Sequence, residues 1–279
     1  MADEVIRVMT NDHGFRVIAA STTDSVREVI AHQKVRGDVA SALAGLVTGA
    51  VLLRETMAPD LRVQGILRGA DQHGTIVGDS FPDGSVRGLV QRADAFRMGP
   101  GALMQMMRHL VTGGLQQGIV DVGRAGGIGE ALTAYFHESE QLVCMARVGC
   151  HFEGDELRGC GGFVVQLLPE AERPAHFVMT QRLEDLPGVG EFLKRPDFSA
   201  NVLIEELVYG MDKTELARSP LRFACRCDET LVLSALASLG KEDIADMIAA
   251  GEGLEIDCDY CGKHYDIAIE RLRALVSAS

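Results

Sequence analysis

The sequence predicts an α+β fold in which a large N-terminal domain is built from β-sheet layers packed on a buried helix. A helical linker and a small C-terminal cysteine module follow it. Short β-branched segments with alternating apolar positions recur through the first 168 residues. Residues 38–57 are apolar nearly all round, as in a helix that is covered on most sides. Five of the eight prolines then fall between residues 169 and 220, ahead of two closely spaced cysteine pairs.

Composition places the chain in the globular class. Its 279 residues are 47% hydrophobic and 24% charged, which excludes a disordered chain, collagen and a disulfide-dense miniprotein. The net charge of −13 argues against nucleic acid as a partner. The N-terminus is acidic, unlike a signal peptide, and the apolar run from Val39 to Leu53 is shorter than the ~20 residues that span a bilayer. We expect a cytoplasmic protein with no membrane partner, whose seven cysteines are mostly reduced.

The predicted N-terminal domain, residues 1–169, opens with a hairpin, because two β-branched runs flank the turn Asn11–Gly14. A helix over residues 24–34 comes next, capped by Asp24 or Thr23. After the buried helix we predict an antiparallel meander, an amphipathic helix and two strands, over residues 61–67, 75–78 and 85–90, then 129–138, then 142–148 and 162–168. The glycine-rich segment 123–129 lacks the Gly-x-Gly-x-x-Gly spacing of a dinucleotide site and is predicted to be a turn.

Residues 170–221 are predicted to form a linker of short helices that rests on the main domain. Its prolines separate charged, weakly helical pieces such as residues 181–186 and 203–209. Short pieces make few cooperative contacts, so we expect this linker to be metastable.

The C-terminal module, residues 222–279, carries the strongest chemical signal. A C-x-C pair and a C-x-x-C pair are separated by 30 residues. Alternate residues of an extended segment point to one side, and a C-x-x-C pair converges across a tight turn, so the four thiolates can meet at one point. Four thiolates are the tetrahedral set that Zn²⁺ prefers. We therefore predict one zinc ion per chain, held by Cys225, Cys227, Cys258 and Cys261.

The spacer between the cysteine pairs contains two helix-like pieces, residues 229–237 and 241–250. A module this small cannot build a sufficient core, so metal binding is expected to supply on the order of 10 kcal/mol or more of its folding energy. His264, three residues after the last cysteine, is an alternative ligand.

Several stretches outside the cysteines carry a family resemblance. They are Leu221-Arg222-Phe223 and Gly262 beside the cysteine pairs, the inter-cysteine segment Ala235–Glu242, the strand signature Gly159–Pro169, the helix end Tyr135–Gln141 and the turn Asp83–Gly88. With the cysteines, they resemble the redox-regulated 33-kDa chaperonin (heat-shock redox chaperone) family over nearly the whole chain.

The resemblance implies a stress-response chaperone and not an enzyme. It would be an ATP-independent holdase that protects unfolding client proteins from oxidative and thermal aggregation. The reduced form, with zinc on the four cysteines, would be inactive. Oxidation would form the redox-active disulfides Cys225–Cys227 and Cys258–Cys261, release zinc, unfold the module and linker, and yield an active homodimer. No Gly-x-x-x-x-Gly-Lys-[Ser/Thr] sequence occurs, which agrees with ATP independence.

Two features depart from the family pattern. Residues 96–118 do not resemble it, and their methionines, Met98, Met104, Met106 and Met107, predict either the core face of an amphipathic helix or an adaptable binding surface. Cys144, Cys150 and Cys160 are additional cysteines, which we interpret as small buried apolar residues, a second redox or metal site being the alternative.

Two other functions remain open from the residues alone. A thiol-disulfide oxidoreductase would need one exposed C-x-x-C dithiol of low pKa that cycles during catalysis. A static zinc-stabilised module that binds a protein or nucleic acid would keep its metal under oxidation.

Overall fold

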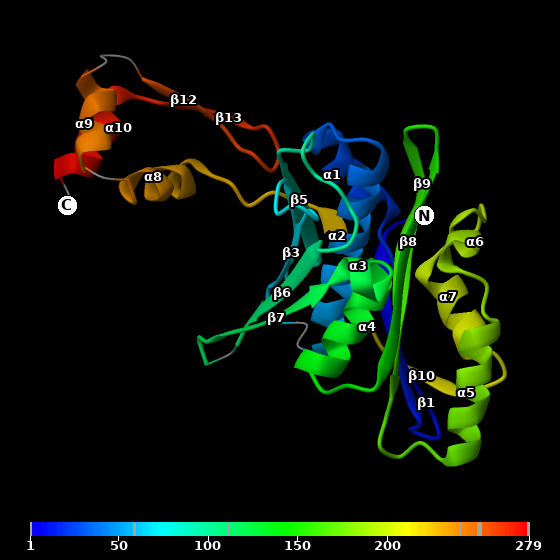
Figure 1. Cartoon of the computed structure of the whole chain (residues 1–279). Helices are drawn as coiled ribbons and strands as arrows, with labels where there is room; N and C mark the ends of the chain where they lie inside the picture. The colour runs from blue at the N-terminus through cyan, green and yellow to red at the C-terminus, as the bar shows by residue number, and fades with distance from the viewer. Residues whose placement is uncertain (1, 58–59, 111, 240, 250–252, 278–279) are drawn as a thin grey trace. The chain divides into compact units, whose positions relative to one another are not determined.

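The computed structural model describes residues 2–57, 60–110, 112–239, 241–249 and 253–277. The chain divides into two compact units, Met1–Ala224 and Cys225–Ser279 (Figure 1). The first unit contains both the predicted domain 1–169 and the predicted linker 170–221. The second begins at Cys225, three residues after the predicted start of the module at residue 222. The α+β class predicted from the sequence is confirmed by this architecture.

A five-stranded antiparallel sheet forms one layer of the first unit. Its strands run in the order β10-β1-β2-β9-β8. The predicted N-terminal hairpin is confirmed, because β1 pairs with β2 and Val8 lies opposite Val17. The strand bounds are β1 Glu4–Thr10, β2 Phe15–Ser21, β8 Cys144–Glu153, β9 Glu156–Leu167 and β10 Lys213–Pro220.

A six-stranded sheet forms the second layer, in the order β11-β5-β4-β3-β6-β7. Its central strands are the predicted meander, paired antiparallel in sequence order. Only β11 joins its neighbour β5 in parallel. The bounds are β3 Val63–Arg68, β4 Thr75–Ser80, β5 Ser85–Gln91, β6 Leu103–His109, β7 Leu115–Asp121 and β11 Arg222–Phe223.

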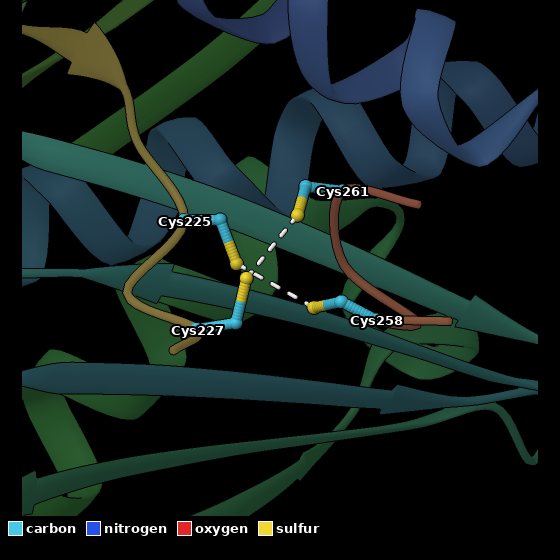
Figure 2. Close-up of side chains that lie close together, drawn as sticks. All are labelled: Cys225, Cys227, Cys258 and Cys261. Atoms are coloured by element: carbon cyan, nitrogen blue, oxygen red, sulfur yellow. Dashed lines mark hydrogen bonds between the residues drawn. The ribbon is translucent and has the colours of Figure 1, made fainter. Parts of the chain in front are cut away.

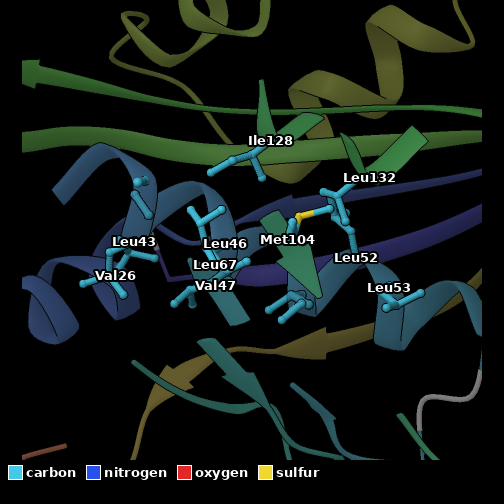
Figure 3. Packing of buried hydrophobic residues seen from close by; sticks show 14 of the residues in the cluster. Val26, Leu43, Leu46, Val47, Leu52, Leu53, Leu67, Met104, Ile128 and Leu132 are labelled. Atoms are coloured by element: carbon cyan, nitrogen blue, oxygen red, sulfur yellow. The ribbon is translucent and has the colours of Figure 1, made fainter. Parts of the chain in front are cut away.

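The predicted buried helix is α2, Gly37–Met57, and it packs against both sheets. By length and hydropathy alone α2 could span a membrane, but 78% of its apolar window is buried inside the fold. Figure 3 shows Leu46 and Val47 of α2 among core side chains of neighbouring elements. At Gly78 of β4 a Cβ would come 3.1 Å from the Val47 nitrogen, so glycine permits the close approach of strand and helix. The helices α1 Thr23–Gln33, α3 Val122–Ala125 and α4 Ile128–Ser139 complete this core.

A Leu46→Ala substitution tests whether α2 is the centre of this core. Leu46 is fully buried against Gly65, so truncation leaves a cavity and is expected to destabilise the first unit by about 2–5 kcal/mol. The measurement is the free energy of unfolding in urea. Leu115→Ala is the control, because Leu115 is 51% exposed, and its effect should stay within about 0.5 kcal/mol.

Two local predictions were wrong. The methionine-rich segment contains strand β6 instead of a helix. Met104 and Met106 are buried at alternate positions, which is the period of a strand, while Met98 is 40% exposed. At the start of α1 the cap residue is Thr22, which makes no side-chain cap hydrogen bond, so neither Thr23 nor Asp24 caps the helix.

The residues of the predicted linker cover the outer face of the five-stranded sheet (Figure 1). Three helices do so: α5 Arg173–Asp185, α6 Val189–Leu193 and α7 Ala200–Leu207. Apolar residues alternate between the two faces of the sheet, so that Ile18 faces the α2 core while Val17 and Ala19 face these helices. The end of the segment is not helical, because residues 213–220 form β10 and pair with β1.

The second unit has a small core of its own, made by Leu236, Ile244, Tyr265, Ile267 and Leu272. The two predicted spacer helices are present, and a hairpin and a last helix follow them. The bounds are α8 Glu229–Ala237, α9 Lys241–Ala249, β12 Leu254–Asp257, β13 His264–Ile267 and α10 Ile269–Ser277.

Candidate metal centre

The four cysteines predicted as ligands come from two local structures. Cys225 and Cys227 lie in the segment without regular secondary structure between β11 and α8. Cys258 and Cys261 lie in the turn that joins β12 to β13. In this turn the backbone N–H groups of Cys261 and Gly262 donate to the Cys258 carbonyl, at 3.3 and 2.7 Å. Gly262 has a φ of +67°, which glycine adopts without strain, so the turn can aim both sulfurs to the same side.

The four sulfurs form one cluster in which all Sγ atoms lie within 4.8 Å of one another (Figure 2). Cys225 Sγ is 3.7 Å from Cys258 Sγ, and Cys227 Sγ is 3.4 Å from Cys261 Sγ. A tetrahedral zinc site with Zn–S bonds of about 2.3 Å has sulfur–sulfur edges of about 3.8 Å. The observed spacings are close to that edge, so these residues can hold a metal ion and fit zinc.

The electrostatics of the cluster also favour a cation. Burial opposes ionisation of Cys227, but the nearby Tyr265 hydroxyl and the neighbouring thiols outweigh it and lower the pKa of Cys227 to about 7. Burial, together with hydrogen bonds among the thiols, raises the pKa of Cys225 and of Cys261. The Cys227 thiol therefore ionises most readily, while Cys225 and Cys261 keep their protons and donate hydrogen bonds within the cluster. A divalent cation would replace the shared protons and allow all four to be thiolates.

Removal of the metal is expected to unfold residues 225–279, because the second unit's small hydrophobic core is its main other support. A high-affinity zinc chelator should abolish amide hydrogen-exchange protection in α8, β12 and β13. Protection in α2 of the first unit should remain, and this is the internal control. A module that keeps its protection without metal would contradict the assignment of a structural role to the metal.

His264 does not join the cysteine cluster. Its imidazole lies between two carboxylates, with Nδ1 2.7 Å from Asp257 Oδ1 and Nε2 3.0 Å from Asp266 Oδ1. Over the described part of the chain, the one other group of potential ligands is Glu255, His264 and Asp266, and all three are exposed. Exposed acidic groups of this kind are common without a metal.

The three additional cysteines lie in strands β8 and β9 of the first unit. Burial raises the pKa of the Cys144 thiol and of the fully buried Cys160 thiol to about 12, and it also raises the pKa of Cys150. Cys160 belongs to the α2 core, and the other two pack against it. Cys160 is the buried apolar residue that the sequence predicts, whereas Cys144 and Cys150 are half-buried, and all three lie outside the metal centre.

Comparisons with known proteins find relatives that match nearly the whole chain. Curated relatives named 33 kDa chaperonin include one from Listeria monocytogenes, 29% identical, and one from Synechococcus elongatus, 30% identical. Each match covers 99% of this chain and 98% of the relative. A crystal structure of the 33 kDa chaperonin (heat shock protein 33 homolog) from Thermotoga maritima has the same fold, with a TM-score of 0.81 over 100% of this chain and 99% of that one, at 21% identity. The family model described as Hsp33 protein matches residues 3–268. The chain therefore belongs to the Hsp33 family.

Proposed function

We propose that this protein is a redox-regulated, ATP-independent chaperone that holds unfolding client proteins and protects them from oxidative and thermal aggregation. The observation that carries the proposal is the cluster of four sulfurs within 4.8 Å of one another in a unit with a small core. The names of the curated relatives support a chaperone, and a cytoplasmic location follows from the same family. We assign it no catalytic residue.

In the reduced state Cys225, Cys227, Cys258 and Cys261 would hold one zinc ion. When bound, zinc keeps the four sulfurs as thiolates, the form that reacts with oxidants, and ties the segment before α8 to the β12–β13 turn. The protein would then be folded and inactive as a chaperone.

Oxidation would convert the four thiolates into two disulfides. We propose the pairs Cys225–Cys227 and Cys258–Cys261, which are neighbours in the sequence and belong to the same sulfur cluster. Each pair gives up two electrons to hypochlorous acid, which is reduced to chloride and water, or to peroxide, which is reduced to water. No thiolate then remains as a ligand, so the metal leaves and the module loses its main support.

The chain between module and linker offers a route for the unfolding. Cys225 follows directly on Ala224, whose N–H donates to the Val86 carbonyl at 3.1 Å. Just before it, β11 contributes two paired residues, and Phe223 stacks on His32 at 4.8 Å. Arg222 adds an ion pair to Asp83 and Leu221 is buried in the first unit, but the β11–β5 ladder spans two residues. The strand β10, which precedes this segment, is an edge strand of the five-stranded sheet. An unfolded module would let this segment fray toward the linker helices.

Detachment of α5, α6 and α7 would expose an apolar face of the five-stranded sheet. A contiguous apolar surface of this kind suits both unfolding clients and a second copy of the chain, so we propose a homodimer as the active form. The residues of the sheet face that would be exposed are Ile6, Val8, Phe15, Val17, Ala19, Phe163 and Val165.

The test compares reduced and hypochlorous-acid-treated protein in a thermal aggregation assay with citrate synthase and no nucleotide. Oxidised protein should suppress light scattering at near-stoichiometric ratios, and reduced protein should not. Equal protection by both forms would contradict redox regulation. Turnover in an insulin-reduction assay would instead indicate a thiol oxidoreductase, and salt-dependent binding of nucleic acid would indicate a static binding module.

A further inference from the structure

Two cysteines outside the metal centre lie directly opposite each other on neighbouring strands. In the antiparallel pair β8–β9, Cys150 is the register partner of Cys160. The backbone of Cys160 makes its hydrogen bonds on the side facing away from β8. Its carbonyl accepts from the Thr22 N–H at 2.9 Å, and its N–H donates to Thr23 Oγ1 at 2.9 Å. Both groups point away from β8, so Cys150 and Cys160 are a non-hydrogen-bonded pair. Such pairs have Cα atoms about 4.5 Å apart, within the range that disulfides accept.

The two sulfurs also face the same element. Cys160 Sγ lies 3.3 Å from Thr48 Oγ1, and Cys150 Sγ lies 4.0 Å from the Ser41 carbonyl oxygen. Ser41 and Thr48 are two turns apart on one side of α2. Both side chains therefore project from the sheet into the layer between β8–β9 and α2, and a bond between the sulfurs needs no movement of one strand past the other.

Access to the pair is one-sided. Cys150 is half-buried and lines an open cleft of about 340 Å³, together with Ser41, Gly45, Ile128 and Val148. Cys160 lies behind it and is fully buried. A small oxidant that enters the cleft reacts first with Cys150. Cys160 is then placed to attack the oxidised Cys150 sulfur and form a disulfide.

We propose that Cys150 and Cys160 are a second redox site of this protein, which forms an intrachain cross-strand disulfide under hypochlorous acid or peroxide stress. Hypochlorous acid transfers chlorine to Cys150 Sγ, and the hydroxide that leaves takes up the Cys150 thiol proton and becomes water. Cys160 Sγ then attacks Cys150 Sγ, loses its proton to solvent, and displaces chloride. The two thiols thus lose two electrons and two protons in total, and hypochlorous acid becomes chloride and water. With peroxide, Cys150 passes through a sulfenic acid and water is the leaving group.

Burial makes this pair slower to react than exposed thiolates, because the pKa of each thiol is raised and little thiolate is present near neutral pH. The site therefore responds to strong oxidative stress and stays reduced in an ordinary cytoplasm. Once formed, the disulfide would cross-link β8 to β9 on the face packed against α2. This part of the fold must stay intact if the linker detaches.

The chain allows a direct test, because trypsin separates the three extra cysteines. Cleavage after Arg124, Arg147, Arg158 and Arg182 places Cys144 in residues 125–147, Cys150 in 148–158 and Cys160 in 159–182. The full-length protein is treated with hypochlorous acid in excess over its thiols, alkylated under denaturing conditions and digested without reductant. We expect the peptide 148–158 linked to 159–182, in monomers isolated on a non-reducing gel, and lost on reduction.

Cys150→Ser should remove this linked peptide and increase the recovery of alkylated Cys160 at least about tenfold, while the matched control Cys144→Ser should leave the link unchanged. Cys160→Ala provides a second variant, with no hydroxyl to bury, and should also abolish the link. Three results would overturn the proposal. Cys150 and Cys160 could both be recovered as alkylated thiols, either could be linked to residues 125–147, or the link could occur only between chains. These readouts do not depend on the metal centre. Absence of the Cys150–Cys160 link would therefore not contradict the proposed chaperone function, and absence of redox-regulated chaperone activity would not contradict this disulfide.

Discussion

A Cys258→Ser variant is expected to lose the metal and the folded structure of residues 225–279. Cys258 supplies one of the four clustered sulfurs, 3.7 Å from Cys225 Sγ, and its carbonyl also organises the turn that carries Cys261. A serine hydroxyl is not ionised at neutral pH and is a poor ligand for a soft site. We expect zinc affinity to fall by more than about 100-fold, beyond the effect of losing an outer-shell partner.

The measurements for this variant are zinc affinity by chelator competition and hydrogen exchange in α8, β12 and β13. Cys144→Ser is the matched control, because Cys144 lies in β8, outside the cluster, and its replacement should leave zinc affinity unchanged. If Cys258→Ser bound zinc as tightly as the parent, the four-sulfur centre would be the wrong assignment.

The second large effect is expected from Leu203→Asp in α7. Leu203 is fully buried in the apolar cluster between α7 and the five-stranded sheet. Burying that charge is expected to cost about 3 kcal/mol or more, enough to detach a helix of eight residues. The variant should suppress aggregation without any oxidant while still retaining its zinc.

Asn201→Asp is the control for this experiment. It introduces the same carboxylate on the exposed side of α7, where Arg218 already lies 3.4 Å from the side-chain oxygen, so chaperone activity should remain dependent on oxidant. Detachment of the linker in Leu203→Asp is detected as proteolysis within residues 173–207. If the linker detaches and citrate synthase is still not protected, the surface under the linker is not where clients bind.

Local patterns were sufficient for much of the first unit. The hairpin around Asn11–Gly14, the apolar helix at 38–57 and the meander after it each have a period or a turn signal within a short window. The strand β10 has no such signal, because its place is set by pairing with β1, so that Lys213 lies opposite Thr10. The strand β6 was not predictable, because four methionines in a short stretch suit either a helix or a strand, and only the sheet decides which of them are buried.

The candidate site was predictable for the same reason. A C-x-C and a C-x-x-C pair each fix their geometry locally, so the spacing already indicated four converging sulfurs. The opposition of Cys150 and Cys160 was not predictable, because a strand register depends on the whole β8–β9 pairing, and a shift of one residue would place the two sulfurs on opposite faces of the sheet.

The redox switch is tested most directly by titrating reduced, zinc-loaded protein with hypochlorous acid and measuring zinc release and aggregation suppression on the same samples. A chromogenic chelator reports the zinc, and thermally unfolding citrate synthase reports the protection. We expect about one zinc per chain, the capacity of a Cys₄ site, to appear in step with protection. Zinc that stays bound while protection appears, or that leaves without any protection, would contradict the claim that Cys225, Cys227, Cys258 and Cys261 are the switch of a chaperone.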